Sequence, residues 1–210
     1  MDGQFITFEG NDGAGKTTVL NRIIEILQPK LGNQLVTTRE PGGNLVSEKI
    51  RNIIMNNEMD ARTEALLFAA ARREHLVRKI IPALEQHKLV LCDRYVDSSV
   101  AYQGAGRKIG KKQIADMNQF ATNHVMPNLT IYFDVPVEVG LKRIMQHRTN
   151  EINRLDRQQH DFYIRVHDAY DEIAQSNPKR VVKVDATKPV NEVVANVLKI
   201  IKQRFPQYFE

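Results

Sequence analysis

The chain has 210 residues, of which 42% are hydrophobic and 26% charged, a composition typical of a single globular domain with a buried core. Its longest uninterrupted apolar run, 65–71, is too short to cross a bilayer, and the first residues lack signal-peptide character. The single cysteine, Cys92, excludes an intramolecular disulfide. We therefore expect a cytoplasmic protein with no membrane partner.

The net charge of +5 raises the question of a nucleic-acid partner. Lys and Arg are spread along the chain and mixed with acids, and the densest basic cluster, 106–112, is typical of a solvated loop that runs into a helix. We therefore expect no nucleic-acid partner. A basic balance fits small phosphate-bearing anions equally well.

Short apolar runs alternate with amphipathic helical patterns along the chain. A strand over 4–9 leads into a glycine-rich loop, and a helix with an apolar stripe follows it. A second strand over 34–38 precedes a turn, and a long helical pattern runs from residue 60 or 63 to about 88, with Pro82 as a bend or restart. The later expected strands are 89–93, 130–135 and 181–186, and the later expected helices are 111–122, 137–147, 157–176 and 189–204.

This alternation predicts an α/β fold in which helices cover both faces of a parallel sheet. No repeat or linker divides the chain, so we expect one domain over residues 1–210. Ligands of such sheets bind at the carboxyl ends of the strands. Four polar segments follow strands directly, at residues 10, 39, 93 and 185. We expect these segments to form one site.

The first of these segments, EGNDGAGKTT, fits the phosphate-binding pattern G-x-x-x-x-G-K-[ST]. Its glycines let backbone N–H groups turn toward an anion, and the helix that follows adds its partial positive charge. Lys16 is expected to reach the β- and γ-phosphates, and the Thr17 hydroxyl to bind Mg²⁺. The predicted ATP-binding residues are Gly10, Asn11, Asp12, Gly13, Ala14, Gly15, Lys16, Thr17 and Thr18.

Asp93 ends an apolar strand, where an acidic side chain can hold Mg²⁺ or its waters. Aspartate is also common wherever a strand turns into a loop. The adjacent Arg94 favours the functional interpretation, because the pair suits a metal together with a phosphate.

Five segments together resemble bacterial thymidylate kinase: FEGNDGAGKTT, TREPGG, TEALLFAAARREH, DRYVDSSVAYQG and NRLD, between Phe5 and Asp156. The resemblance implies a P-loop nucleoside monophosphate kinase with a five-stranded parallel sheet and a short lid. It also implies transfer of the γ-phosphate of ATP to dTMP, giving dTDP for dTTP synthesis, by a homodimer.

The matching motifs imply a role for each acceptor-site residue. Arg39 and Arg94 would hold the acceptor phosphate, which fits the two-pronged grip of a guanidinium. Phe68 would stack on thymine, while Arg72 and Gln103 would bind its edge. Asp12 would face the 3′-hydroxyl, Ser99 would line the pocket, and Tyr102 would crowd a ribose 2′-hydroxyl.

Phe68 and Arg72 are four residues apart, so they share a helix face. Without the family pattern, Phe68 would be read as a core aromatic residue, Arg72 as a solvated charge and Tyr102 as a packing residue. The six histidines show no metal-ligand spacing.

The phosphate-binding loop contains no arginine, so further positive charge must come from elsewhere. The polar segment 147–157 corresponds to the family's lid, and Arg148 or Arg154 is the expected catalytic arginine, a choice that the sequence leaves open. Each is alternatively an exposed loop arginine paired with Glu151 or Asp156. The lid-arginine class often has glutamate in place of Asp12.

Two other functions remain to be weighed. A deoxynucleoside kinase also has a P-loop and an Asp-Arg motif, but its hydroxyl acceptor needs a general base, whereas a phosphate acceptor is already ionised at neutral pH. A regulatory P-loop ATPase has no use for a second anion site at Arg39 and Arg94. The sequence therefore favours the monophosphate kinase.

Overall fold

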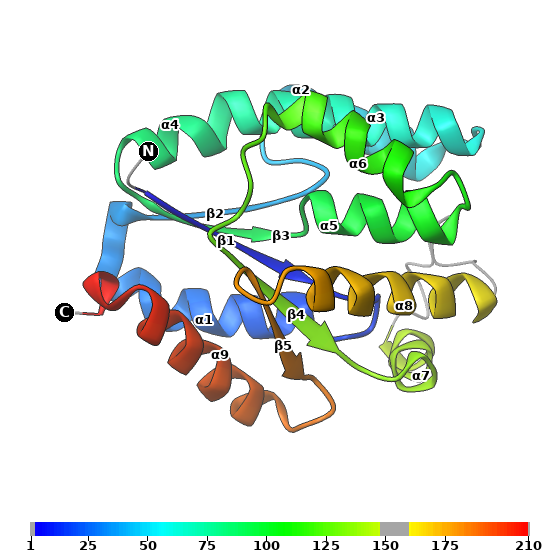
Figure 1. Cartoon of the computed structure of the whole chain (residues 1–210). Helices are drawn as coiled ribbons and strands as arrows, with labels where there is room; N and C mark the ends of the chain where they lie inside the picture. Colours follow the sequence, from blue (N-terminus) through cyan, green and yellow to red (C-terminus); the bar gives the residue numbers. More distant parts are fainter. Residues whose placement is uncertain (1–2, 148–159, 210) are drawn as a thin grey trace.

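A computed structural model describes residues 3–147 and 160–209 and confirms the expected α/β fold. One five-stranded sheet has the order β2-β3-β1-β4-β5, and every neighbouring pair is parallel (Figure 1). The strands are β1 (Gln4–Glu9), β2 (Leu35–Arg39), β3 (Leu89–Asp93), β4 (Leu129–Asp134) and β5 (Val181–Asp185).

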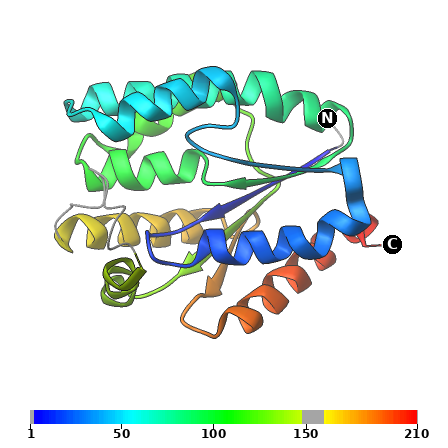
Figure 2. The same cartoon turned by 180° about the vertical axis from the view of Figure 1, so that it is seen from behind.

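Helices cover both faces of this sheet, as Figures 1 and 2 show from opposite sides. The helices are α1 (Lys16–Leu31), α2 (Leu45–Asn56), α3 (Ala61–His75), α4 (Ile81–Glu85), α5 (Val96–Ser99), α6 (Lys111–Thr122), α7 (Val137–His147), α8 (His160–Ser176) and α9 (Val190–Arg204). The described residues also contain the π-helical stretches η2 (Leu76–Ile80) and η3 (Val100–Gly106) and the 3₁₀ turns η1 (Gly32–Gln34) and η5 (Pro206–Tyr208).

Side chains alternate between the two faces along each strand, because successive residues of a strand point in opposite directions. Ile6 and Leu91 pack on one face with residues of α1 and α9. Phe5, Val90 and Cys92 pack on the other face beneath η2 and α4. Burial on both faces explains why β3 reads as a continuous apolar run in the sequence.

Three local features differ from the sequence-based expectation. The helix expected up to about residue 88 ends at His75 and continues as the π-helix η2 and the short helix α4. Pro82 lies at the start of α4 and has no amide proton to donate to the preceding turn, so the wider π-helical turn is placed directly before it. Helix α2 and the helical stretch from Val96 to Gly106 were not predicted.

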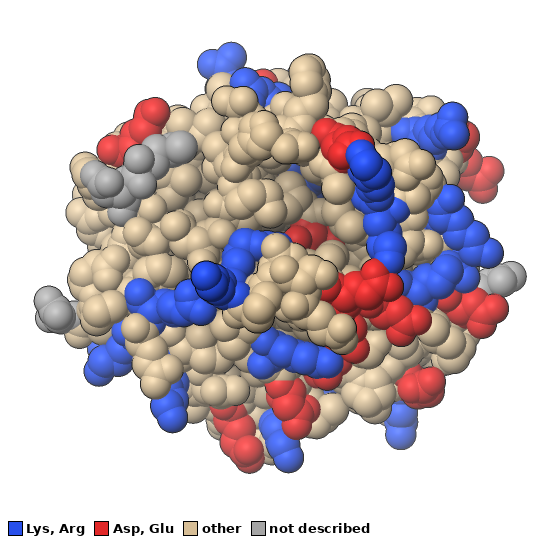
Figure 3. All heavy atoms as spheres, in the orientation of Figure 1, with Lys and Arg blue, Asp and Glu red and all other residues tan. Residues whose placement is uncertain are grey.

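No helix within residues 3–147 or 160–209 is long and apolar enough to span a membrane. Figure 3 shows Lys and Arg side chains interspersed with Asp and Glu over one face of the molecule.

Candidate active site

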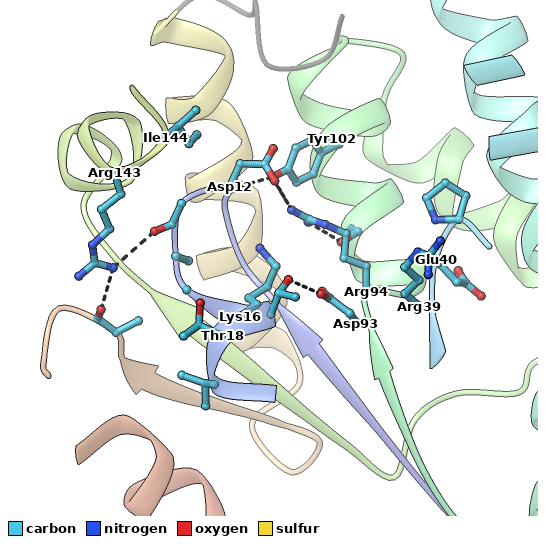
Figure 4. A pocket seen from close by; sticks show the side chains of 18 of the residues that line it. Asp12, Lys16, Thr18, Arg39, Glu40, Asp93, Arg94, Tyr102, Arg143 and Ile144 are labelled. Carbon is cyan, nitrogen blue, oxygen red and sulfur yellow. Dashed lines mark hydrogen bonds and ion pairs between the residues drawn. The ribbon is translucent and has the colours of Figure 1, made fainter. Parts of the chain in front are cut away.

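A cavity of about 1090 Å³ opens at the carboxyl edge of the sheet. Residues that follow β1, β3 and β5 line it, as do the last residue of β2 and side chains of α2, α3, η3, α7 and α8. Figure 4 shows Arg143 at one end and Arg39 with Glu40 at the other, with Lys16 and Arg94 between them. The four polar segments predicted from the sequence therefore do converge.

The loop from Gly10 to Gly15 depends on glycine for its path. Gly13 has φ 77°, and a Cβ there would lie 2.1 Å from the carbonyl oxygen of Gly140. Gly15, with φ 82°, precedes α1 and provides no side-chain cap. The first N–H groups of α1 therefore face the cavity without a capping side chain, the arrangement that favours an anion.

Lys16 is curled into this loop. Its Nζ donates to the carbonyl oxygens of Gly10 at 3.0 Å and Asn11 at 2.8 Å. Burial, and then the positive charge of Arg94, lower the pKa of Lys16 to about 8. A bound phosphate would stabilise the charged form of Lys16 and so raise its pKa again.

Thr17 and Asp93 bring a hydroxyl and a carboxylate together. Thr17 Oγ1 donates to Asp93 Oδ2 at 2.6 Å. The other carboxylate oxygen, Asp93 Oδ1, is buried without a hydrogen-bond partner among the described residues. Hard oxygen donors with an unused lone pair fit a hydrated Mg²⁺ ion.

Arg94 follows Asp93 and adopts φ 71°, a left-handed conformation that costs a non-glycine residue energy and that recurs at active sites. Its Nη2 donates to Asp12 Oδ1 at 2.5 Å, and its Nη1 donates to Ser98 Oγ at 3.0 Å and to Tyr170 at 3.3 Å. These contacts fix the position of the Arg94 guanidinium in the lining of the cavity.

A buried carboxylate lies behind Arg94. Glu9 accepts hydrogen bonds from the Tyr95 amide at 2.6 Å, Ser98 Oγ at 2.5 Å and the Tyr170 hydroxyl at 3.0 Å. Burial, and then the charge of Asp97, raise the pKa of Glu9 to about 7. Glu9 therefore holds the two hydroxyl groups that in turn hold Arg94.

Arg39, the last residue of β2, is half-exposed and paired with Glu48 of α2. Its Nη2 lies 3.0 Å from each carboxylate oxygen of Glu48, which also accepts from the Gly43 amide at 3.0 Å. Glu48 thus occupies the guanidinium that was predicted to hold a phosphate. A bound phosphate dianion would compete with this carboxylate for the same donor.

Arg72 is almost completely buried and held on several sides. Its Nε donates to Glu40 at 2.7 Å, its Nη1 to Ser99 Oγ at 3.0 Å and also to Asn118, and its Nη2 to the Tyr95 carbonyl at 3.2 Å. A guanidinium has five N–H donors, so these bonds leave one on Nη2 that no described residue accepts and that a ligand could use. Arg72 is therefore not the solvated charge that sequence reasoning suggested as an alternative.

Phe68, Tyr102 and Gln103 also line the cavity, Phe68 on the same side of α3 as Arg72. The Tyr102 hydroxyl accepts from the Asp12 amide at 3.0 Å and from Arg94 Nη2 at 3.1 Å. The Gln103 amide donates to Glu64 at 3.1 Å. The expected aromatic and hydrogen-bonding side chains thus face one space.

Most predicted site residues line the cavity, with two kinds of exception. Gly10 and Asn11 lie beneath it and contribute the carbonyl oxygens that hold Lys16. Arg148 and Arg154 lie outside the described residues, as does most of the expected lid over 147–157.

Sequence reasoning missed several parts of the cavity wall, one of which is the helix α2. Arg51 of α2 is half-buried, and its Nη1 donates to the Pro41 carbonyl at 3.2 Å. Asn44 accepts from the Ser47 amide at 3.0 Å as the N-cap of α2, and this cap is a sequence signal that predicts the helix carrying Arg51.

Arg143 of α7 is another residue of the cavity wall that sequence reasoning missed. Its Nη1 donates to the carbonyl oxygens of Ala186 at 3.1 Å and Gly13 at 3.4 Å, so it joins α7 to the loop after β5. No spacing in the sequence distinguishes Arg143 from other helix-surface arginines.

Asp134, His167 and Asp171 place one ligand atom each within 4.8 Å of one another. Lys183 Nζ lies 3.1 Å from Asp134 Oδ2 and 2.8 Å from Asp171 Oδ1, so an ammonium already pairs with both carboxylates. This cluster is an ion-pair network rather than a further metal centre.

Comparisons with known proteins agree with this geometry. The family model described as thymidylate kinase matches residues 8–197. The chain is 56% identical to a thymidylate kinase of Lactiplantibacillus plantarum, covering 99% of this chain and 96% of that protein, and 55% identical to one of Levilactobacillus brevis over the full length of both. A crystal structure of thymidylate kinase from Ehrlichia chaffeensis superposes with a TM-score of 0.77 at 36% identity, covering 96% of this chain and 99% of that one. The chain belongs to the thymidylate kinase family.

Proposed function

We propose that this chain phosphorylates dTMP to dTDP at the described cavity, with ATP as phosphoryl donor and Mg²⁺ bound beside it. The observation that carries the proposal is that two groups suited to binding anions line the same cavity. Lys16 and the N-terminus of α1 form the first group, and Arg39 with Arg94 form the second. A transfer between two phosphates needs both, whereas a hydroxyl acceptor needs only the first and a base.

The position of the phosphate-binding loop supports a proposal for which end of the cavity binds the donor and which binds the acceptor. With the donor phosphates on Gly13, Lys16 and Thr17, its nucleoside extends toward Arg143 and the loop 186–190. The acceptor then occupies the other end, with its phosphate on Arg39 and Arg94 and its base between Phe68, Arg72 and Gln103. Ser99 Oγ accepts a hydrogen bond from Arg72, and Asp12, which accepts one from Arg94, would lie beside the acceptor sugar.

Thr17 and Asp93 form the proposed Mg²⁺ site. Asp93 Oδ1 has no hydrogen-bond partner among the described residues, so this oxygen is available as a ligand of the ion or as an acceptor for its waters. When bound, the ion neutralises developing charge on the donor phosphates. The side chains that line the cavity align the donor and acceptor phosphates and exclude water. No residue acts as general base, since the acceptor phosphate is already ionised.

The lid arginine remains a proposal from the sequence. Arg148 or Arg154 would add positive charge to the transferred phosphoryl group, because Arg39 and Arg94 are committed to the acceptor. The single kinase domain over 1–210, with its lid at 147–157, is proposed on the same basis.

A homodimer fits the surface of α3 and α6. Leu66 and Phe120 are 60% and 89% exposed on these two contacting helices, and Leu66 borders a groove of about 260 Å³ that also contains Ile109, Ile114 and Met117. Apolar side chains gathered on neighbouring helices are typical of an interface. A cytoplasmic location is proposed from the lone cysteine and the nucleotide substrates.

The direct test is ADP release from ATP by the purified protein, offered dTMP, dUMP, dCMP, ribothymidine monophosphate or thymidine. We expect dTMP to be the preferred acceptor and activity to require Mg²⁺. Preference for thymidine over dTMP would instead establish a deoxynucleoside kinase, and ADP release independent of any acceptor would establish an ATPase.

A further inference from the structure

Glu64 lies at the base end of the cavity on α3, one turn before Phe68, and is 1% exposed. Its carboxylate contacts Gln103 in η3 and Arg107, the residue that follows η3. Oε1 accepts from the Gln103 amide nitrogen at 3.1 Å, and Oε2 lies 3.0 Å from Arg107 Nη2. Arg107 Nε also lies 3.2 Å from Oε1. Arg107 therefore balances the charge of Glu64 and holds it in place.

This contact determines which way round the Gln103 side-chain amide lies. A carboxylate only accepts hydrogen bonds, so the amide atom facing Glu64 must be the NH₂ group. The reversed amide would place two acceptors together and lose a charge-assisted bond, which disfavours it by on the order of ten- to a hundredfold. The Gln103 carbonyl oxygen is consequently the amide atom presented to a base in the cavity.

The donor pattern of a thymine matches this arrangement. A thymine carries a carbonyl oxygen at position 4 and an N–H donor at position 3. The remaining N–H of Arg72 suits the carbonyl, and the Gln103 oxygen suits the N–H. Cytosine has a donor at position 4 and an acceptor at position 3, so both contacts become repulsive.

We infer that Glu64, held by Arg107, is a specificity-determining positioning residue that fixes the Gln103 amide so that the site binds only the protonated imide of its pyrimidine. The inference rests on the proposed function, because it places a thymine beside Gln103. It adds to that function by assigning the choice of pyrimidine base to Glu64 and Arg107, two residues that need not touch the nucleotide.

The experiment compares dTMP with 5-bromo-dUMP. Bromine is similar in size to the thymine methyl group but makes the N3 proton more acidic, so at alkaline pH this acceptor loses N3–H while dTMP keeps it. The measured quantity is the ratio of kcat/KM for 5-bromo-dUMP to that for dTMP, at neutral and at alkaline pH. Changes at the P-loop cancel in this ratio, as does any inactive fraction of a preparation.

For the wild type, we expect the ratio to fall as N3 ionises, because the Gln103 oxygen repels the anion. Glu64→Gln lets the amide turn and donate to the ionised base, so the fall should be at least several-fold smaller. At neutral pH, Glu64→Gln should raise KM for dTMP more than it changes kcat or KM for ATP. Glu74→Gln is the matched control, since Glu74 is on the same helix and pairs with Arg78 away from the cavity.

Arg107→Gln provides a second variant that leaves Glu64 and Gln103 in place, and a smaller change in the same direction is expected from it. A wild-type ratio independent of pH, or a Glu64→Gln ratio within twofold of wild type at both pH values, overturns the inference while leaving dTMP phosphorylation intact. A wild-type protein that releases no ADP with dTMP rejects the proposed function, and the inference with it.

Discussion

Asp12 of the phosphate-binding loop and Arg94 at the end of β3 form an ion pair, with Arg94 Nη2 donating to Asp12 Oδ1 at 2.5 Å across 82 residues of sequence. The Tyr102 hydroxyl lies against both residues, and the guanidinium carbon is 4.8 Å from the centre of its ring. These contacts of the protein itself orient the arginine that is proposed to hold the acceptor phosphate. Binding would exchange one anionic partner of Arg94 for another.

Tyr102 is expected to reject a ribose sugar through the bulk of its ring. Tyr102→Phe loses the hydroxyl contacts with Asp12 and Arg94, each worth about 1 kcal/mol, so turnover should fall several-fold while the preference for dTMP over ribothymidine monophosphate is kept. Tyr102→Ala should relax that preference. The measurement is kcat/KM for both acceptors, and equal relaxation in the two variants would assign the selection to the hydroxyl.

Lys16 should take up a proton when ATP binds at about pH 8 and above. Its lowered pKa means that part of the lysine is neutral in this range before ATP binds, and the phosphates favour the charged form. Calorimetric titration in buffers of different ionisation enthalpy measures the uptake. Lys16→Ala should bind without this uptake, keep its circular dichroism spectrum and lose turnover. Equal uptake in the variant, or near-normal turnover, would contradict the assignment.

The lid arginines, which lie outside the described residues, should differ in importance. Of Arg148→Ala and Arg154→Ala, one should lower kcat by roughly 10³-fold or more and the other much less, because a single arginine stabilises the transition state. Binding of dTMP should change little by comparison. Arg157→Ala is the control. If both variants keep kcat within a few fold of wild type, the positive charge comes from elsewhere.

Glu9 should make folding stability depend on pH. Its pKa is about 7 in the folded protein against an ordinary 4.5, so the folded state binds this proton more tightly than the unfolded state. The stability gained from the proton is present below pH 4.5 and is lost as the pH rises through about 7, on the order of 3 kcal/mol in total. Glu9→Gln should flatten this part of the profile of unfolding free energy measured with urea. Glu25→Gln, on the exposed side of α1, should leave the profile unchanged, and an equal slope in both variants would exclude Glu9 as its source.

Phe120 should be part of the proposed dimer interface. Its side chain is 89% exposed on α6, so Phe120→Asp adds a charge without cost to the folded monomer but disfavours burial against a second copy. Sedimentation velocity should show a dimer for the wild type and a monomer for the variant. Met145→Asp is the control, because this side chain is 74% exposed on α7, away from α3 and α6. A wild-type monomer, or a dimeric Phe120→Asp, would place the interface elsewhere or remove it.

The sheet was predictable from the sequence because its three central strands, β1, β3 and β4, are buried along almost their whole length and therefore appear as mainly apolar runs. The phosphate-binding loop was equally clear, since its glycines and Lys16 have fixed spacing. Pro82 was identified as a break, but its consequence, a π-helical turn, depends on how the backbone redistributes its hydrogen bonds.

The cavity wall was harder to predict, because its members become informative only through contacts between distant segments. Arg51 was missed along with the helix that carries it, and Arg143 has no local pattern at all. Arg72 needed the fold to show that an arginine within a helical pattern is buried and held by Glu40. Glu64 similarly acquires a role only through its contact with Gln103, 39 residues away.

Cys92, buried on β3 and donating to the Arg94 carbonyl at 3.1 Å, has a practical consequence for work on this protein. Burial, and then the charge of Glu40, raise the pKa of this thiol well above its ordinary value, so both its access to reagents and its thiolate form are suppressed. Alkylation of the native chain must therefore wait for β3 to open. Because no other cysteine exists in the sequence, the rate of that reaction follows the opening of the very strand that carries Asp93 toward the active site.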